Sequence, residues 1–124
     1  MKTAINYVEV PHQLQCGDSV FPRVIVNDGS VTNLRECERW INDNIEVLED
    51  ALKSSGAILF RGFPVNAAET FDTFSNAFAY PNFTYKESLS NAVRINFTER
   101  VFTANEAPKE VEIYLHHEMA QTPI

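Results

Sequence analysis

Apolar residues recur every three or four positions between residues 34 and 52, and this spacing predicts an amphipathic helix. Asn33 stands before the stretch and Glu36 follows three positions later, which is the arrangement of a capping box. Gly56 provides the expected C-terminal stop. The apolar stripe should pack against a sheet, and it consists of Leu34, Cys37, Trp40, Ile41, Ile45, Leu48 and Leu52.

Three further stretches have the pattern of strands. N-Y-V-E-V alternates between polar and apolar residues, and F-P-R-V-I-V-N-D is expected to form one strand that ends at the Asp28-Gly29 turn. G-A-I-L-F-R-G-F is a nearly continuous apolar run, which predicts a strand buried on both faces. Gly62 and Pro64 would end that strand.

A second helix is predicted downstream, with Asn66 as its cap, Glu69 at its third position and an end near Tyr80-Pro81. The following residues, 82–109, are polar and aromatic without a sustained period, and they predict a long loop with short extended pieces. The apolar face of the helix would consist of Phe71, Phe74 and Phe78.

Composition narrows the class of protein. A chain of 124 residues with 44% hydrophobic residues predicts a single globular domain over residues 1–124, and the predicted helices and strands make its class α+β. The net charge of −7 and the lack of a basic run exclude a nucleic-acid surface. No apolar run has the length of a membrane span or of a signal peptide core, so we expect no membrane partner and a cytoplasmic location. Cys16 and Cys37 are too few for a disulfide framework, and Cys37 is predicted to be a buried free thiol.

Candidate chemistry is concentrated in the segment E-I-Y-L-H-H-E-M. If residues 112–119 form a strand, His116 and Glu118 share one face and His117 points to the other. An imidazole and a carboxylate at this spacing suit Fe(II) with open coordination positions. The alternative is the solvated end of an ordinary strand.

The order of these segments resembles the N-terminal half of the taurine dioxygenase-like family of Fe(II)- and 2-oxoglutarate-dependent oxygenases. Two segments carry the resemblance: G-A-I-L-F-R-G-F and the downstream His-x-Glu motif. The form L-H-H-E-M-A is most similar to a subgroup, the syringomycin-biosynthesis-like hydroxylases, whose motif is Leu-His-Asn-Glu-Met. The resemblance covers residues 20–124.

This resemblance implies the N-terminal portion of a double-stranded β-helix (jelly roll) with flanking helices, incomplete in this chain. It implies Fe(II) held by His116 and Glu118, with 2-oxoglutarate as cosubstrate and a small, amino-acid-like molecule as substrate. Thr103 and Asn105 would lie near the cosubstrate or substrate, and the alternative is that they are turn residues bonded to their own backbone. The loop over residues 82–109 is a candidate lid.

The family completes its iron site with a distal histidine and binds 2-oxoglutarate through a later arginine. This sequence has no histidine after His117 and no arginine after Arg100. We therefore expect a fragment without activity of its own, which self-associates or meets a complementing C-terminal half through an open sheet edge. The alternative, from another class of protein, is a non-catalytic α+β module that binds a partner through that edge.

Three other residues are assigned no site role. Trp40 lies on the helix stripe and is predicted to be core. Arg61 ends a predicted strand, where an arginine usually extends to solvent or pairs with a carboxylate. His12 lies in a loop beside Pro11 with no motif around it, and it is not expected to bind a metal.

Overall fold

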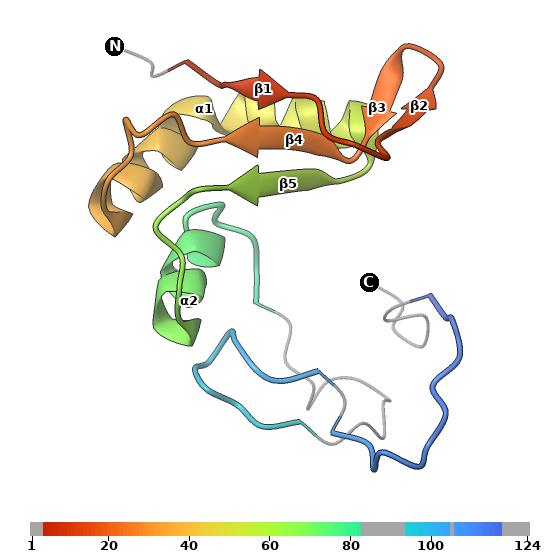
Figure 1. The fold of residues 1–124 in the computed structure, drawn as a ribbon. Helices are drawn as coiled ribbons and strands as arrows, with labels where there is room; N and C mark the ends of the chain where they lie inside the picture. The colour runs from red at the N-terminus through yellow and green to blue at the C-terminus, as the bar shows by residue number, and fades with distance from the viewer. Residues whose placement is uncertain (1–3, 83–93, 105, 118–124) are drawn as a thin grey trace. The chain divides into compact units, whose positions relative to one another are not determined.

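The computed structural model describes residues 4–82, 94–104 and 106–117 (Figure 1). The chain divides into two compact units, Met1–Ala79 and Tyr80–Ile124. The predicted single domain over residues 1–124 stays a prediction. No helix in the described parts of the chain is both long and apolar enough to cross a lipid bilayer.

The first unit is built on a three-stranded sheet with the order β1-β4-β5. Strand β1 (Tyr7–Val8) pairs antiparallel with β4 (Arg23–Val26), and β4 pairs parallel with β5 (Ile58–Arg61). Helix α1 (Leu34–Ser55) connects the two parallel strands. Strands β4 and β5 with α1 therefore form a βαβ unit, because parallel neighbours need a crossover connection.

The expected single strand F-P-R-V-I-V-N-D is wrong, because it is two strands. Strand β3 (Ser19–Phe21) forms a two-stranded hairpin with β2 (Leu14–Cys16), and β4 begins only at Arg23. Pro22 lies between them. A proline has no N–H group to donate to a ladder, so it is a natural boundary between β3 and β4.

Helix α1 begins and ends where the sequence predicts. The Oδ1 atom of Asn33 accepts a hydrogen bond from the Glu36 backbone N–H at 3.0 Å. Gly56 has φ 79° and donates its N–H to the carbonyl of Leu52 at 2.7 Å. The reciprocal half of the box is displaced by one residue, since Glu36 Oε2 accepts from the backbone N–H and the hydroxyl of Thr32, each at 2.8 Å.

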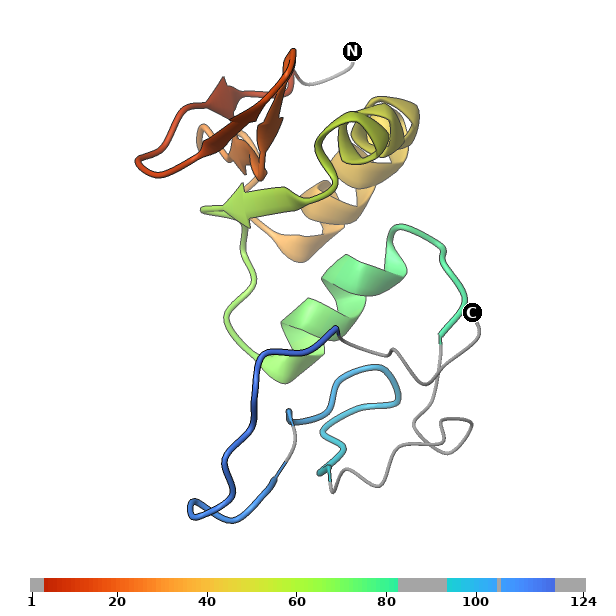
Figure 2. The same ribbon diagram turned by 90° about the vertical axis from the view of Figure 1, so that its right-hand side faces the viewer.

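The core lies between α1 and one face of the sheet (Figure 2). Ile25 of β4 and Ile41 of α1 are fully buried, and Trp40 is 5% exposed. The predicted burial of Trp40 and of the Cys37 thiol is confirmed, whereas Leu52 is exposed. The buried cluster consists of Ile25, Val31, Cys37, Trp40, Ile41, Leu48 and Phe74.

Burial of β5 on both faces is a wrong prediction. Ile58 and Phe60 pack against the core, but Leu59 is 37% exposed and Arg61 is also exposed. Strand β5 is at an edge of the three-stranded sheet, and the core lies on one face of it. An apolar run alone does not distinguish a strand covered on one face from a strand covered on two.

Helix α2 (Ala68–Asn76) exists as predicted, but its two ends differ from the prediction. Its N-cap is Ala67 rather than Asn66, and the Thr70 hydroxyl accepts from the backbone N–H groups of both residues at 2.9 Å. The helix ends at Asn76, before the predicted stop near Tyr80. The Thr70 side chain, inside the first turn, therefore takes the place of the cap that was expected from Asn66.

The described part of the second unit holds little regular structure. Residues 94–104 form a turn with one isolated bridge between Asn96 and Phe102. This agrees with the predicted loop with short extended pieces. The strand predicted over residues 112–119 is wrong for residues 112–117, which belong to no strand and whose side chains are exposed. A segment with the alternating sequence pattern of a strand forms one only when its backbone can pair with a second strand. The jelly roll expected for the complete fold stays a prediction.

Candidate functional site

His116 is exposed, and its ring is oriented by the neighbouring backbone. The Nδ1 atom lies 2.7 Å from the carbonyl oxygen of Tyr114. A carbonyl can only accept a hydrogen bond, so Nδ1 carries the proton and the lone pair of the neutral ring is on Nε2. Metal-binding histidines commonly donate their second ring N–H to a backbone carbonyl in this way. The local geometry of His116 therefore fits a metal ligand.

The partner predicted for His116 is Glu118, which lies outside the described residues. His117 is described and exposed. Because residues 112–117 are not a strand, alternation along a strand no longer explains why His116 and Glu118 would share a face. An imidazole and a carboxylate remain a donor set suited to Fe(II). Among residues 4–82, 94–104 and 106–117, no three His, Cys, Asp or Glu side chains are grouped closely enough to hold a metal ion.

Thr103 forms hydrogen bonds within its own loop. Its hydroxyl accepts from the Ile95 N–H at 3.0 Å, and its own N–H donates to the Ile95 carbonyl at 2.9 Å. The Arg94 guanidinium donates to the Thr103 carbonyl at 3.1 Å. These bonds agree with the alternative that Thr103 is a turn residue bonded to nearby backbone. Its contact with a cosubstrate or substrate stays a prediction. Asn105 lies outside the described residues.

Asn27 joins two loops, a role that the sequence patterns did not indicate. Its Nδ2 atom donates to the carbonyls of Val31 at 2.7 Å and Gly62 at 2.9 Å. Its Oδ1 atom accepts from the N–H groups of Gly29 at 3.1 Å and Val31 at 3.2 Å. Asn27 thus ties together the carboxyl ends of β4 and β5. The available signal was its position before an Asp-Gly turn, where asparagine side chains often bond to nearby backbone.

The Cys37 thiol is not a candidate nucleophile or metal ligand. Burial, and to a smaller extent the carboxylate of Glu38, raises the pKa of the Cys37 thiol to about 11. Only the thiolate is nucleophilic or binds a metal, and at neutral pH this thiol stays protonated. Cys16 is exposed on the β2–β3 hairpin.

Comparison with known proteins finds similarity to a plant protein. The chain is 37% identical over 117 residues to a clavaminate synthase-like protein of Arabidopsis thaliana. The match covers 90% of this chain but 35% of the relative, so the chain spans about a third of the relative's length. No family model matches the chain. At the broad level, the similarity supports the superfamily of Fe(II)- and 2-oxoglutarate-dependent oxygenase-like proteins.

Proposed function

We propose that this chain is part of an Fe(II)- and 2-oxoglutarate-dependent oxygenase of the taurine dioxygenase-like family. It would contribute His116 and Glu118 to the iron site and would not complete the reaction alone. The substrate would be a small, amino-acid-like molecule that is hydroxylated. The subgroup of syringomycin-biosynthesis-like hydroxylases belongs to the same proposal.

The observation that carries this proposal is the similarity to the clavaminate synthase-like protein over nearly the whole chain. The geometry of His116 adds independent support, because the Tyr114 carbonyl selects the tautomer that a ligating imidazole needs. The match to only 35% of the relative agrees with a chain that supplies part of a larger site.

The residues of this chain would have separate tasks. His116 would present Nε2 to the metal, with its ring held by the hydrogen bond to the Tyr114 carbonyl. Glu118 would add a carboxylate oxygen. When bound, iron would activate dioxygen, which is the oxidant, and 2-oxoglutarate would supply two electrons. The Asn27 hydrogen bonds would keep the two loops at the ends of β4 and β5 in one arrangement. The lid expected of residues 82–109 falls partly outside the described residues, and it stays a prediction.

An anaerobic titration with Fe(II), repeated in the presence of 2-oxoglutarate, tests the assignment of ligands. We expect weak binding that is lowered on the order of tenfold or more in His116→Ala and in Glu118→Ala. A visible charge-transfer band that requires both additions would report the assembled site. His117→Ala and His12→Ala are the matched controls, and both should bind iron like the original chain. Equal binding by all four variants would contradict the assignment.

A second candidate role concerns residues 111–115, V-E-I-Y-L. Val111 and Ile113 are more than half exposed, and Leu115 is 104% exposed. An extended apolar stretch at a surface commonly marks a site of association. We propose that this segment binds a polypeptide that supplies the remaining iron ligands.

Mixing tests the second role. The chain would be combined with the portion of the Arabidopsis protein that lies outside the aligned region, and the complex measured by sedimentation. We expect a one-to-one complex that is abolished by Leu115→Asp but not by Val47→Asp, which changes an exposed apolar residue of α1. Self-association of the chain without the added polypeptide would contradict the proposed partner.

A further inference from the structure

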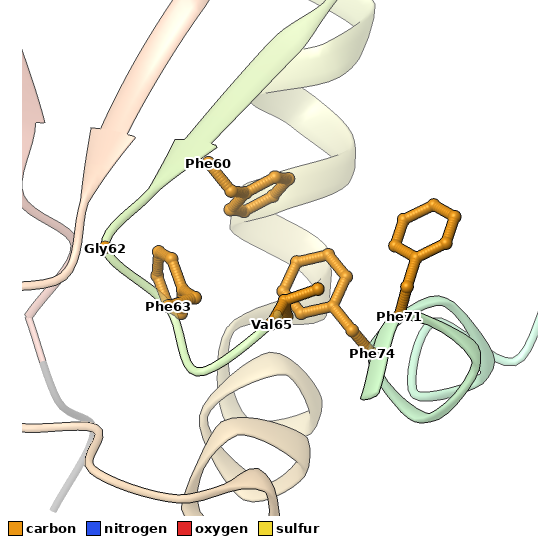
Figure 3. Close-up of a pocket in the computed structure, with 6 residues that line it drawn as sticks. All are labelled: Phe60, Gly62, Phe63, Val65, Phe71 and Phe74. Carbon is orange, nitrogen blue, oxygen red and sulfur yellow. The ribbon is translucent and has the colours of Figure 1, made fainter. Parts of the chain in front are cut away.

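An apolar pocket lies between the end of β5, the loop that follows it and α2 (Figure 3). Its volume is about 310 Å³. No charged or hydrogen-bonding side chain lines it. We call it the Phe pocket, and its lining residues are Phe60, Gly62, Phe63, Val65, Phe71 and Phe74.

Three of the aromatic rings that line the pocket contact one another edge to face. Phe74 contacts Phe60 edge-on with ring centroids 5.3 Å apart, and Phe63 with centroids 6.1 Å apart. Edge-to-face contacts between aromatic rings are favourable in energy, so these rings stabilise one another at an angle. Figure 3 shows the Phe71 ring standing apart from the other rings, and this side chain is 49% exposed while Phe74 is 9% exposed. The pocket therefore has a buried floor and an accessible rim.

The loop after β5 is held in a defined shape. Gly62 has φ 75°, a conformation that side-chain-bearing residues seldom adopt. Its carbonyl accepts from Asn27 Nδ2 at 2.9 Å, which anchors the loop to the end of β4. The Val65 N–H donates to the Phe63 carbonyl at 2.7 Å. The walls of the Phe pocket are thus fixed by hydrogen bonds that do not involve a ligand.

Size and chemistry restrict the occupant. The volume is at the lower end of the range for ligand pockets, and it is about twice the ~150 Å³ of an apolar cavity that holds benzene. A charged molecule would lose its hydration without gaining a partner from the lining side chains. An uncharged molecule with one or two aromatic rings would bury apolar surface against four phenylalanine rings.

The backbone hydrogen bonds beside the pocket disfavour an extended peptide as the occupant. The carbonyl of Gly62 and the N–H of Val65 already have partners. The N–H groups of Asn66 and Ala67 both donate to the Thr70 hydroxyl at 2.9 Å. An extended peptide binds mainly through main-chain hydrogen bonds, and these groups are no longer available for them.

We propose that the Phe pocket binds a small, neutral aromatic molecule between benzene and naphthalene in size. Toluene is a suitable probe, and benzoate is its charged counterpart. Trp40, the one tryptophan of the sequence, has its ring centroid 5.0 Å from that of Phe63 and so reports on the pocket wall. We expect toluene to change the Trp40 emission and the NMR shifts of the lining residues in a saturable way, with benzoate weaker by about tenfold or more.

Two variants test the location. Val65→Phe should fill the pocket, and Phe71→Ala should remove its rim; we expect each to weaken toluene binding by about tenfold. Phe71 is half exposed, so its substitution should leave the fold intact, which the far-UV spectrum would check. Val47→Ala removes a comparably exposed apolar side chain from α1 and should leave binding unchanged.

Several outcomes would overturn the proposal. These are a linear, unsaturable response to toluene, equal binding of benzoate, or full binding by both pocket variants. Tighter binding of N-acetylphenylalaninamide than of toluene would assign the pocket to a polypeptide side chain instead. None of these measurements depends on iron, so failure here leaves the proposed oxygenase role untouched.

Discussion

The two units of the chain differ in what their apolar residues do. In the first, a helix and a sheet share a buried cluster that includes Ile25, Ile41 and Leu48. In residues 94–104 and 106–117 of the second, no side chain is buried, and Ile113, Tyr114 and Leu115 are largely exposed. The candidate metal ligand His116 is in this second unit.

This difference teaches that a hydrophobic pattern becomes structure only where a second surface covers it. Residues 34–52 have a sheet to pack on, whereas residues 111–115 have no pairing strand among the described residues. The first unit should therefore resist perturbation at its surface and be sensitive at its core. The second unit should be nearly indifferent to loss of its apolar side chains.

Thiol reactivity should show the largest effect, as a contrast between the surface and the core of the first unit. Cys16 is exposed and Cys37 is buried, so a disulfide reagent at pH 8 should label Cys16 at once and Cys37 slower on the order of a hundredfold or more. With a pKa of about 11, only about one Cys37 thiol in a thousand is ionised at that pH. Stopped-flow absorbance measures both rates. Cys16→Ser should remove the fast phase alone, and equal rates in the native protein would disprove a closed core.

Substitution in the two units gives a direct energetic comparison. Ile41→Ala leaves a cavity in the core and should lower the free energy of unfolding by about 2–5 kcal/mol. Leu115→Ala should change it by less than about 0.5 kcal/mol, since the Leu115 side chain is fully exposed. Urea denaturation followed by Trp40 fluorescence measures both. A large loss in Leu115→Ala would mean that the second unit supports the first.

Removal of the Asn27 side chain should have an intermediate effect. Asn27→Ala deletes hydrogen bonds to Val31, Gly62 and Gly29, and we expect a loss of about 2 kcal/mol in the same assay. Toluene binding should weaken as well, because Gly62 would lose its anchor. Asn42→Ala, at an exposed site on α1, is the control and should not reduce stability. Unchanged stability in Asn27→Ala would refute its role as a link between the loops.

The smallest effect is expected at the start of α1. Hydrogen bonds from Thr32 and Asn33 lower the pKa of the Glu36 carboxyl below its usual 4.5. A lowered pKa in the folded state means that Glu36 stabilises the protein above pH 4.5 and that this contribution disappears as the pH falls through the lowered value. As the pH is lowered, the melting temperature should fall less in Glu36→Gln than in the original protein. An identical pH dependence would contradict the role of this cap.

Much of the first unit could be predicted from local patterns. The stripe from Leu34 to Leu48, the cap at Asn33 and the stop at Gly56 are features of neighbouring residues, so they can be recognised without tertiary information. The predictions of a single strand across Pro22 and of a helix cap at Asn66 were wrong. In both cases a competing local group, a proline or the Thr70 hydroxyl, decided the boundary.

The candidate site was less predictable than the fold. His116 and Glu118 were paired from a family resemblance and from alternation along a strand, and the structure does not form that strand over residues 112–117. What supports His116 instead is a hydrogen bond to Tyr114, which sequence patterns do not reveal. Asn27 was missed because its partner Gly62 is distant in sequence and close only in the fold.

The sequence by itself determined the features whose causes are local: the two helices, the glycine stop and the acidic character of the chain. It also carried enough likeness to a clavaminate synthase-like protein to indicate the oxygenase superfamily. The tertiary structure alone decided which face of β5 is covered, how Asn27 joins two loops and where four phenylalanine rings leave a hollow. These features depend on contacts between residues that are far apart along the chain, and no local pattern specifies such contacts.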